Sequence, residues 1–186
     1  KEKQKYRGHI KSRHVDFLIT DSDLHILAGI ELDDPTHDTE QAKIIDEFKS
    51  SHPHIKIKYI QNHPSLGSAR ARNIGIEASE SEYICFLDDD DIYLIDRIKN
   101  QMLPMIEESA DYSITNLALY SESDKLIEIR NRNYIKSTSS DDLLKYHLTY
   151  HITGTDSMMF RRDYILKIGC FPHIDVGDEF YLMQKA

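Results

Sequence analysis

The alternation of apolar and polar positions along the chain predicts short strands separated by helices. Residues 15–19 and 26–30 are apolar runs rich in β-branched and aromatic side chains, and the segment between them is too short for a crossover helix. We therefore expect these two runs to form an antiparallel hairpin. Residues 55–59 alternate between apolar and polar side chains, which predicts a half-buried strand. Residues 83–87 are apolar throughout, which predicts a buried strand.

Apolar side chains at helical spacing fill the intervals between these strands. The expected helices cover about residues 39–50, 68–78, 95–106, 140–148 and 161–168, and further strands are expected at 112–120 and 157–160. The order strand, helix, strand, helix, strand is typical of an open α/β sheet. We predict an α/β domain with a mainly parallel central sheet, from which the polar residues 121–140 protrude as a hairpin or loop.

The length of the chain predicts one domain, or one and a fraction, and the charge limits its partners. The 186 residues carry 32 acidic and 23 basic side chains, for a net charge of -9. Nucleic-acid binding depends on clustered Lys and Arg that release counterions, so we expect no nucleic-acid partner. The longest apolar run, residues 26–30, is far shorter than the ~18 residues that suggest a membrane helix, so we expect a cytoplasmic protein. Cys85 and Cys170 lie in apolar stretches and are expected to be core thiols without a disulfide.

Four consecutive aspartates, residues 88–91, follow the apolar run 83–87 directly. Ligands of open α/β sheets bind at the carboxyl ends of the strands, where these side chains would lie. The Asp-x-Asp spacing places Asp88 and Asp90 on the same side of an extended chain, and Asp91 can turn with the following loop. Hard carboxylate oxygens suit Mg²⁺ or Mn²⁺, which complete their coordination with substrate phosphate. Alternatively, the aspartates begin the next helix and face solvent.

Three blocks of this sequence resemble the family-2 glycosyltransferases, over about residues 32–186. The first is GSARARNIGI at residues 67–76, the second is the apolar strand with its aspartates at residues 82–91, and the third is residues 160–183, which lead from Arg161-Arg162 to Asp178-Glu179. The resemblance implies the A-type glycosyltransferase fold, a Rossmann-like, mainly parallel sheet flanked by helices, here incomplete at both ends.

The same resemblance implies an activity and its partners. A metal-dependent, hexosyltransferase-type enzyme would move a sugar from a nucleoside-diphosphate donor to an acceptor hydroxyl with inversion, in surface polysaccharide synthesis. The donor would be of the UDP or dTDP type, and the acceptor would be a saccharide or a lipid-linked saccharide. Such an enzyme would work at the inner face of the membrane, in peripheral contact with it.

The resemblance also assigns residues to the nucleotide. Asp34 would accept the imide N–H of a uracil or thymine base, and Asp88 would hold the ribose side. Arg72 and Asn73 would lie near the nucleotide on the first turn of their helix, where backbone N–H groups favour anions.

The metal and the catalytic base are assigned in the same way. Asp90 would ligate Mn²⁺ or Mg²⁺ together with Asp88, and Asp91 would support the ion. The acidic pair is reversed relative to the Glu-Asp order of the family. Glu179 matches the position of the base, and Asp178 is the second candidate.

The amino-terminal part departs from this family and leaves other functions open. We expect residues 1–38 to be a basic tail and a β-hairpin of uncertain origin, and residues 39–186 to be the nucleotide-sugar-binding domain. The first segment resembles a small nuclease-related domain, in which Asp16, Glu31 and Asp33 would be metal ligands. The alternatives to glycosyl transfer are therefore metal-dependent phosphodiester cleavage and an inactive module that binds nucleotide-sugar.

His147 and His151 stand four residues apart at the end of a predicted helix. This spacing places two imidazoles on one helix face and occurs in zinc sites. No third ligand follows at a recognisable spacing, so we expect both residues to be surface histidines.

Overall fold

The computed structural model describes residues 15–20, 26–31, 38–60, 62, 64, 66–88, 91–121, 123–174 and 176–186. For residues 15–20, 26–31 and most of 38–45, this description covers the backbone of the strands and the helix and not the side chains.

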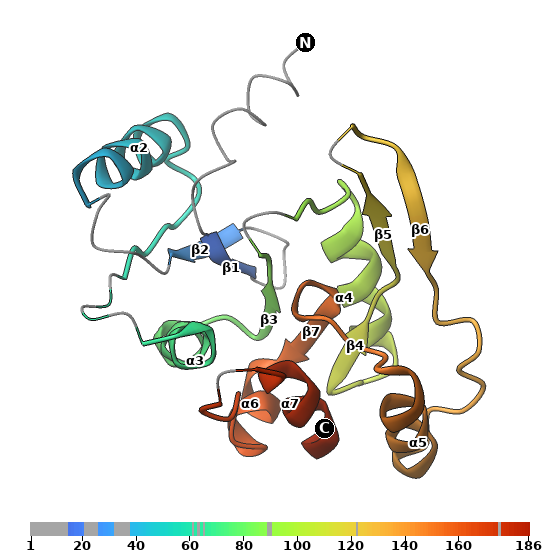
Figure 1. The fold of residues 1–186 in the computed structure, drawn as a ribbon. Helices are drawn as coiled ribbons and strands as arrows, with labels where there is room; N and C mark the ends of the chain where they lie inside the picture. The colour runs from blue at the N-terminus through green and yellow to red at the C-terminus, as the bar shows by residue number, and fades with distance from the viewer. Residues whose placement is uncertain are drawn as a thin grey trace.

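Strands and helices follow one another along the chain, as the apolar pattern predicts (Figure 1). The elements are β1 (Val15–Thr20), β2 (Ile26–Glu31), α2 (Asp38–Ser51), α3 (Ser68–Ala78), β3 (Tyr83–Phe86), α4 (Arg97–Glu107), β4 (Tyr112–Ile114), β5 (Leu117–Tyr120), β6 (Leu126–Arg130), α5 (Ser140–Tyr150), the 3₁₀-helix η1 (Thr155–Ser157), β7 (Met158–Arg161), α6 (Arg162–Lys167) and α7 (Asp178–Lys185). The helix expected at residues 68–78 has the observed bounds. The predicted hairpin of β1 and β2 is confirmed.

The central sheet has five strands in the order β2-β1-β3-β7-β4 (Figure 1). Each hydrogen-bonded pair in it is antiparallel, so the prediction of a mainly parallel sheet is wrong for the described strands. The reason is the position of two strands. β7 runs between β3 and β4 in the opposite direction, so β3 and β4, which are parallel to each other, do not pair. On the other side of β3, the partner is β1 of the hairpin.

Residues 55–60 are not a strand, although their alternating pattern predicts one. The alternation is visible in their exposure, since Ile55 and Ile57 are half-buried whereas Lys56 and Lys58 are exposed. Both edges of β3 are already occupied, by β1 and β7. This amphipathic segment thus lies against the domain without pairing to its central strand.

Side chains of β3 alternate between the two faces of the sheet and divide the core into two clusters. Ile84 and Phe86 pack with apolar residues of α3, α6 and α7. Tyr83 and Cys85 pack on the other face with Met102 and Met105 of α4, and the four side chains of β3 are all buried. Helices therefore cover both faces of β3, and the run of aspartates follows directly after its carboxyl end.

β5 and β6 form a separate two-stranded antiparallel sheet that extends from the domain (Figure 1). Every residue of β6 is exposed. Only β6 of this hairpin lies within residues 121–140, where the sequence predicts a protruding hairpin or loop. The strand predicted at residues 112–120 is instead divided into β4 and β5, which belong to different sheets.

Neither cysteine forms a disulfide; Cys85 is buried in β3, and Cys170 is half-buried after α6. The longest helix that the structure describes is α2, with 14 residues. Over the described part of the chain, no helix combines the length and the apolar character that crossing a bilayer requires.

Candidate functional site

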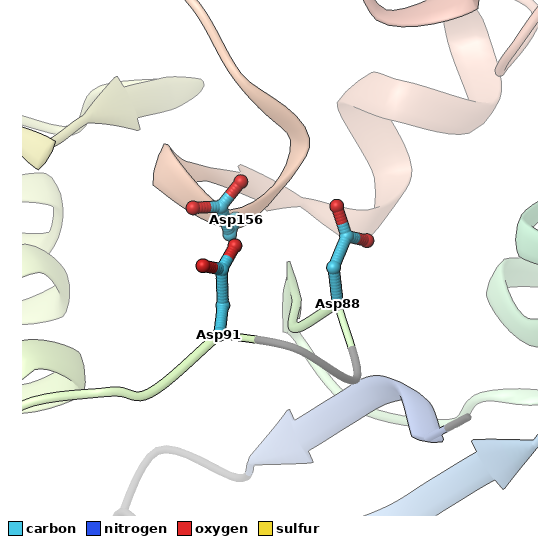
Figure 2. Close-up of side chains that lie close together, drawn as sticks. All are labelled: Asp88, Asp91 and Asp156. Atoms are coloured by element: carbon cyan, nitrogen blue, oxygen red, sulfur yellow. The ribbon is translucent and has the colours of Figure 1, made fainter. Parts of the chain in front are cut away.

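Three carboxylates meet beyond the carboxyl end of β3. Oxygen atoms of Asp88, Asp91 and Asp156 lie within 4.8 Å of one another (Figure 2). The backbone N–H of Asp91 donates to the carbonyl oxygen of Asp88 at 3.1 Å, which turns the chain and brings the two aspartates together. The predicted metal ligand Asp90 lies outside the described residues.

Asp156 reaches this group through strand pairing and was not among the predicted site residues. Cys85 of β3 pairs with Met159 of β7 in antiparallel register. Each step forward along β3 is a step backward along β7, so the same register extended beyond the strands places Asp156 opposite Asp88. Asp156 could be identified from the sequence only if the register between β3 and β7 were already known.

Arg97 fixes the backbone that carries Asp156. Its guanidinium donates to the carbonyl oxygens of Asp156 at 2.8 Å and Met158 at 3.3 Å. The same guanidinium lies 4.0 Å from the centre of the Tyr93 ring, a cation–π contact. The loop with Asp156 is therefore held by α4 on one side and by β7 on the other.

Arg72 connects the end of β3 to the start of α7. Arg72 is only 8% exposed. The guanidinium donates to Asp178 Oδ2 at 3.0 Å and to Asp88 Oδ1 at 3.2 Å. Because α3 begins at Ser68, Arg72 is its fifth residue and lies just beyond the first turn, on which it was expected. The assignment of Arg72 to the nucleotide stays a prediction.

Asn73, the neighbour of Arg72, binds the loop before α7. Its side-chain N–H donates to the carbonyl oxygen of Phe171 at 2.9 Å, and the Phe171 N–H donates to Asn73 Oδ1 at 3.0 Å. Both polar ends of the amide are thus engaged by backbone. This arrangement supports a structural role, and contact of Asn73 with a nucleotide stays a prediction.

Asp178 and Glu179 are the first two residues of α7 and have different surroundings. Asp178 is 6% exposed and paired with Arg72, whereas the Glu179 side chain is 22% exposed. Burial raises the pKa of Glu179, and the neighbouring Asp178 raises it further. A carboxylate with a raised pKa and partial access to solvent suits a general base better than one already engaged by a guanidinium.

Several predicted residues lie where the structure does not describe them. Asp33 and Asp34 are outside the described residues, and the side chains of Asp16 and Glu31 are not described. The base-binding role of Asp34, the nuclease ligands and the domain boundary after residue 38 therefore stay predictions.

The two histidines of α5 divide between core and surface. His147 is 1% exposed, so the prediction of a surface histidine is wrong for this residue. It is buried because α5 packs on α7, where its ring lies 4.3 Å from that of Phe180 and its Nε2–H donates to the Phe180 carbonyl oxygen at 2.8 Å. Burial lowers the pKa of His147. The prediction is confirmed for His151, whose side chain is 50% exposed.

Sequence comparison finds two family models on this chain. The model described as Glycosyl transferase family 2 matches residues 30–168. A second one, described as Protein of unknown function (DUF2726), matches residues 1–54. The second description assigns no activity, so the nuclease-like interpretation of the amino-terminal part is not confirmed by it.

Individual relatives are similar to part of the chain. Glycosyltransferase WfaP of Escherichia coli, named UDP-Glc:alpha-D-GlcNAc-diphosphoundecaprenol beta-1,3-glucosyltransferase, is 36% identical over 95 residues, which are 51% of this chain and 35% of WfaP. Glycosyltransferase GlyG of Streptococcus pneumoniae is 33% identical over 95 residues, which are 51% of this chain and 31% of GlyG. The chain thus spans about a third of the length of these curated relatives.

The structure is similar to a solved one. The crystal structure of S. aureus TarS 1-349 matches with a TM-score of 0.62 at 14% sequence identity, over 84% of this chain and 44% of that chain. At this identity, the similarity shows a shared fold.

Proposed function

The chain belongs to glycosyl transferase family 2 and has the A-type fold of these enzymes, and from this premise we propose that it transfers a hexose from a nucleoside-diphosphate donor to an acceptor hydroxyl. One observation carries the proposal. The carboxylates of Asp88, Asp91 and Asp156 cluster at the end of β3, and Arg72 links this cluster to the acidic start of α7. Arg72 thereby connects the candidate metal site with Asp178, the neighbour of the candidate base Glu179.

The donor atoms of the cluster fit a hard divalent cation. Three carboxylates whose oxygens lie within 4.8 Å repel one another, and a shared Mn²⁺ or Mg²⁺ would relieve this repulsion. Asp88, Asp91 and Asp156 would hold the ion, and Asp90 is a further candidate ligand. When bound, such an ion supplies Lewis-acid stabilisation of the charge on the departing nucleoside diphosphate.

Glu179 is the residue that would accept the proton of the acceptor hydroxyl. As the acceptor oxygen bonds to the anomeric carbon, the bond from that carbon to the diphosphate breaks on the opposite face, and the configuration inverts. Arg72 engages Asp178 and so leaves the neighbouring carboxylate of Glu179 as the base. Fixing donor and acceptor in line would supply much of the remaining rate enhancement.

The names of the relatives suggest the partners. WfaP is named for a UDP-glucose donor and a diphosphoundecaprenol-linked acceptor. We extend this to a uridine diphosphate sugar as donor and a lipid-linked saccharide as acceptor, in surface polysaccharide synthesis at the inner face of the membrane. A thymidine diphosphate sugar is the second candidate donor.

Calorimetry with UDP and dTDP, each with and without Mn²⁺, tests the site. We expect nucleotide binding that requires the ion and that weakens at least tenfold in Asp88→Asn and Asp90→Asn. The exposed Glu107 of α4 offers a matched control, and Glu107→Gln should bind as the wild type does. Release of UDP from UDP-glucose then measures turnover. Tight binding without the ion, or no binding, would contradict the proposal.

A further inference from the structure

The end of α5 and the first turn of α7 are joined by aromatic packing around Phe180. The Phe180 ring lies 4.3 Å from the His147 ring and 5.0 Å from the His151 ring, the latter at an interplanar angle of 86°. The hydrogen bond from His147 to the Phe180 backbone adds a polar link between the helices. The position of His151 relative to α7 is thus fixed by ring contacts and by the helix that precedes it.

His151 adopts a left-handed backbone conformation, with φ 49° and ψ 69°. Its N–H donates to the carbonyl oxygen of His147 at 2.8 Å and closes the end of α5. Glycine or asparagine is usual at such a helix end, because other side chains are strained there.

The side chain of His151 faces the candidate base. Nε2 of His151 lies 3.6 Å from Oε1 of Glu179, which is ion-pair distance and longer than a hydrogen bond. Among the described ionisable groups that act on Glu179, Asp178 opposes its negative charge and His151 supports it. His147 is buried, and its Nε2–H donates to the Phe180 carbonyl oxygen, so its ring packs against Phe180 and His151 without facing Glu179 as an ion-pair partner.

We propose that His151 is a positioning residue for Glu179: it aims the carboxylate from the end of α5 and favours its ionised form. The inference rests on the proposed function, in which Glu179 accepts the acceptor's proton. Burial and Asp178 both raise the pKa of Glu179, and the His151 ring, 3.6 Å from the carboxylate, acts in the opposite direction and so extends the pH range over which the base is ionised.

His151→Gly separates this role from that of a helix cap. Glycine suits the left-handed conformation, so the variant should fold with an unchanged or higher Tm. His151→Lys restores a positive charge at the same position. His54→Gln is the matched control, because His54 is exposed and lies far from His151 and Glu179 in the sequence.

The first measurement is an NMR titration of the Glu179 side-chain carboxyl carbon. We expect its midpoint to rise by roughly half a pH unit in His151→Gly, the size typical of an ion pair that is partly exposed. His151→Lys should return the midpoint toward the wild-type value, and His54→Gln should leave it unchanged. An unchanged midpoint in His151→Gly would overturn the proposal.

The second measurement is the pH profile of UDP release from UDP-glucose with Mn²⁺. In His151→Gly, the acid limb should move to higher pH by the same amount while the plateau at higher pH is largely kept. A lower plateau with an unmoved acid limb would indicate a merely structural residue and overturn the proposal. If the wild type released no UDP at any pH, the proposed function would fail, whereas the NMR midpoint would still decide whether His151 acts on Glu179.

Discussion

Arg72 is a buried cation with a carboxylate on each of two sides. Removing only the guanidinium, as in Arg72→Met, leaves the buried Asp178 without its partner. Breaking a buried pair in this way costs about 3 kcal/mol of unfolding free energy. Urea denaturation should show this loss, and the double variant Arg72→Met/Asp178→Asn should be more stable than Arg72→Met alone. Arg130→Met, at an exposed arginine of β6, should change little; a loss there equal to that of Arg72→Met would contradict the argument.

Glu179, the proposed base, is expected to lower the stability of the fold at the pH values where it is ionised. Its pKa is raised in the folded state, so the unfolded chain ionises first as the pH increases. The folded state is therefore disfavoured above the folded pKa, and this penalty is absent below the unfolded value. Glu179→Gln removes the charge and should raise Tm at pH 8 but not at pH 4. UDP release should fall by about 10³-fold, as expected for loss of a general base.

Scanning calorimetry at the two pH values, together with the turnover assay, checks this prediction. Glu107→Gln is the control, since its carboxylate is exposed at the end of α4. A variant with unchanged turnover would remove Glu179 from the role of base, and Asp178 would then be the candidate to examine.

The residues that sequence could identify at the site were those in contiguous motifs. Asp88 and Asp91 belong to one run of aspartates, and Arg72 belongs to the block at residues 67–76. The contact between Arg72 and Asp178 joins positions 106 residues apart, and a local pattern holds no information on such a pair. Asp156 has no acidic neighbour in the sequence and is visible only once the register of β7 is known.

At the scale of elements, the same distinction separates helices from sheet pairing. Apolar spacing and a glycine before the helix determine α3 locally, and its bounds were predicted as observed. The choice of partner for a strand depends on which edges are free elsewhere, so neither the antiparallel pairing of β3 with β7 nor the irregular path of residues 55–60 follows from their own patterns. Periodicity reports burial, and pairing is decided by the whole sheet.

The 3₁₀-helix η1 contributes Asp156 to the candidate metal site. Asp156→Asn keeps the backbone that Arg97 holds and removes one negative charge from the cluster. Because carboxylate charge contributes directly to the binding of hard cations, we expect Mn²⁺ affinity to fall about tenfold or more. Titration of Mn²⁺ by electron paramagnetic resonance measures the change without nucleotide. Unaltered affinity, with Glu107→Gln as the comparison, would exclude Asp156 as a ligand.

At the scale of the whole molecule, the position of β7 between β3 and β4 concentrates negative charge beyond the carboxyl end of β3. The chain has a net charge of -9, and folding brings acids from the end of β3, from η1 and from the start of α7 into one connected arrangement. Composition gives the excess of negative charge but not its location. Arg72 lies between two of these acids, so its buried positive charge offsets part of their mutual repulsion.

The pH dependence of the global stability should carry the signature of the buried His147. Its pKa is lowered by burial, so the unfolded chain takes up a proton first as the pH falls. The unfolding free energy should be fully retained above about pH 6.5, the usual value for histidine, and should decrease below it until the folded pKa is passed. Because one proton is involved, this residue can change the unfolding free energy by at most about 1.4 kcal/mol per pH unit.

The variant His147→Gln tests this argument. Its side-chain amide can still donate to the Phe180 carbonyl oxygen but does not titrate, so urea denaturation at pH 7 and pH 5 should show a smaller loss of unfolding free energy than in the wild type. His54→Gln should keep the full loss, because that side chain is exposed; equal losses in all three proteins would mean that other groups control the acid response.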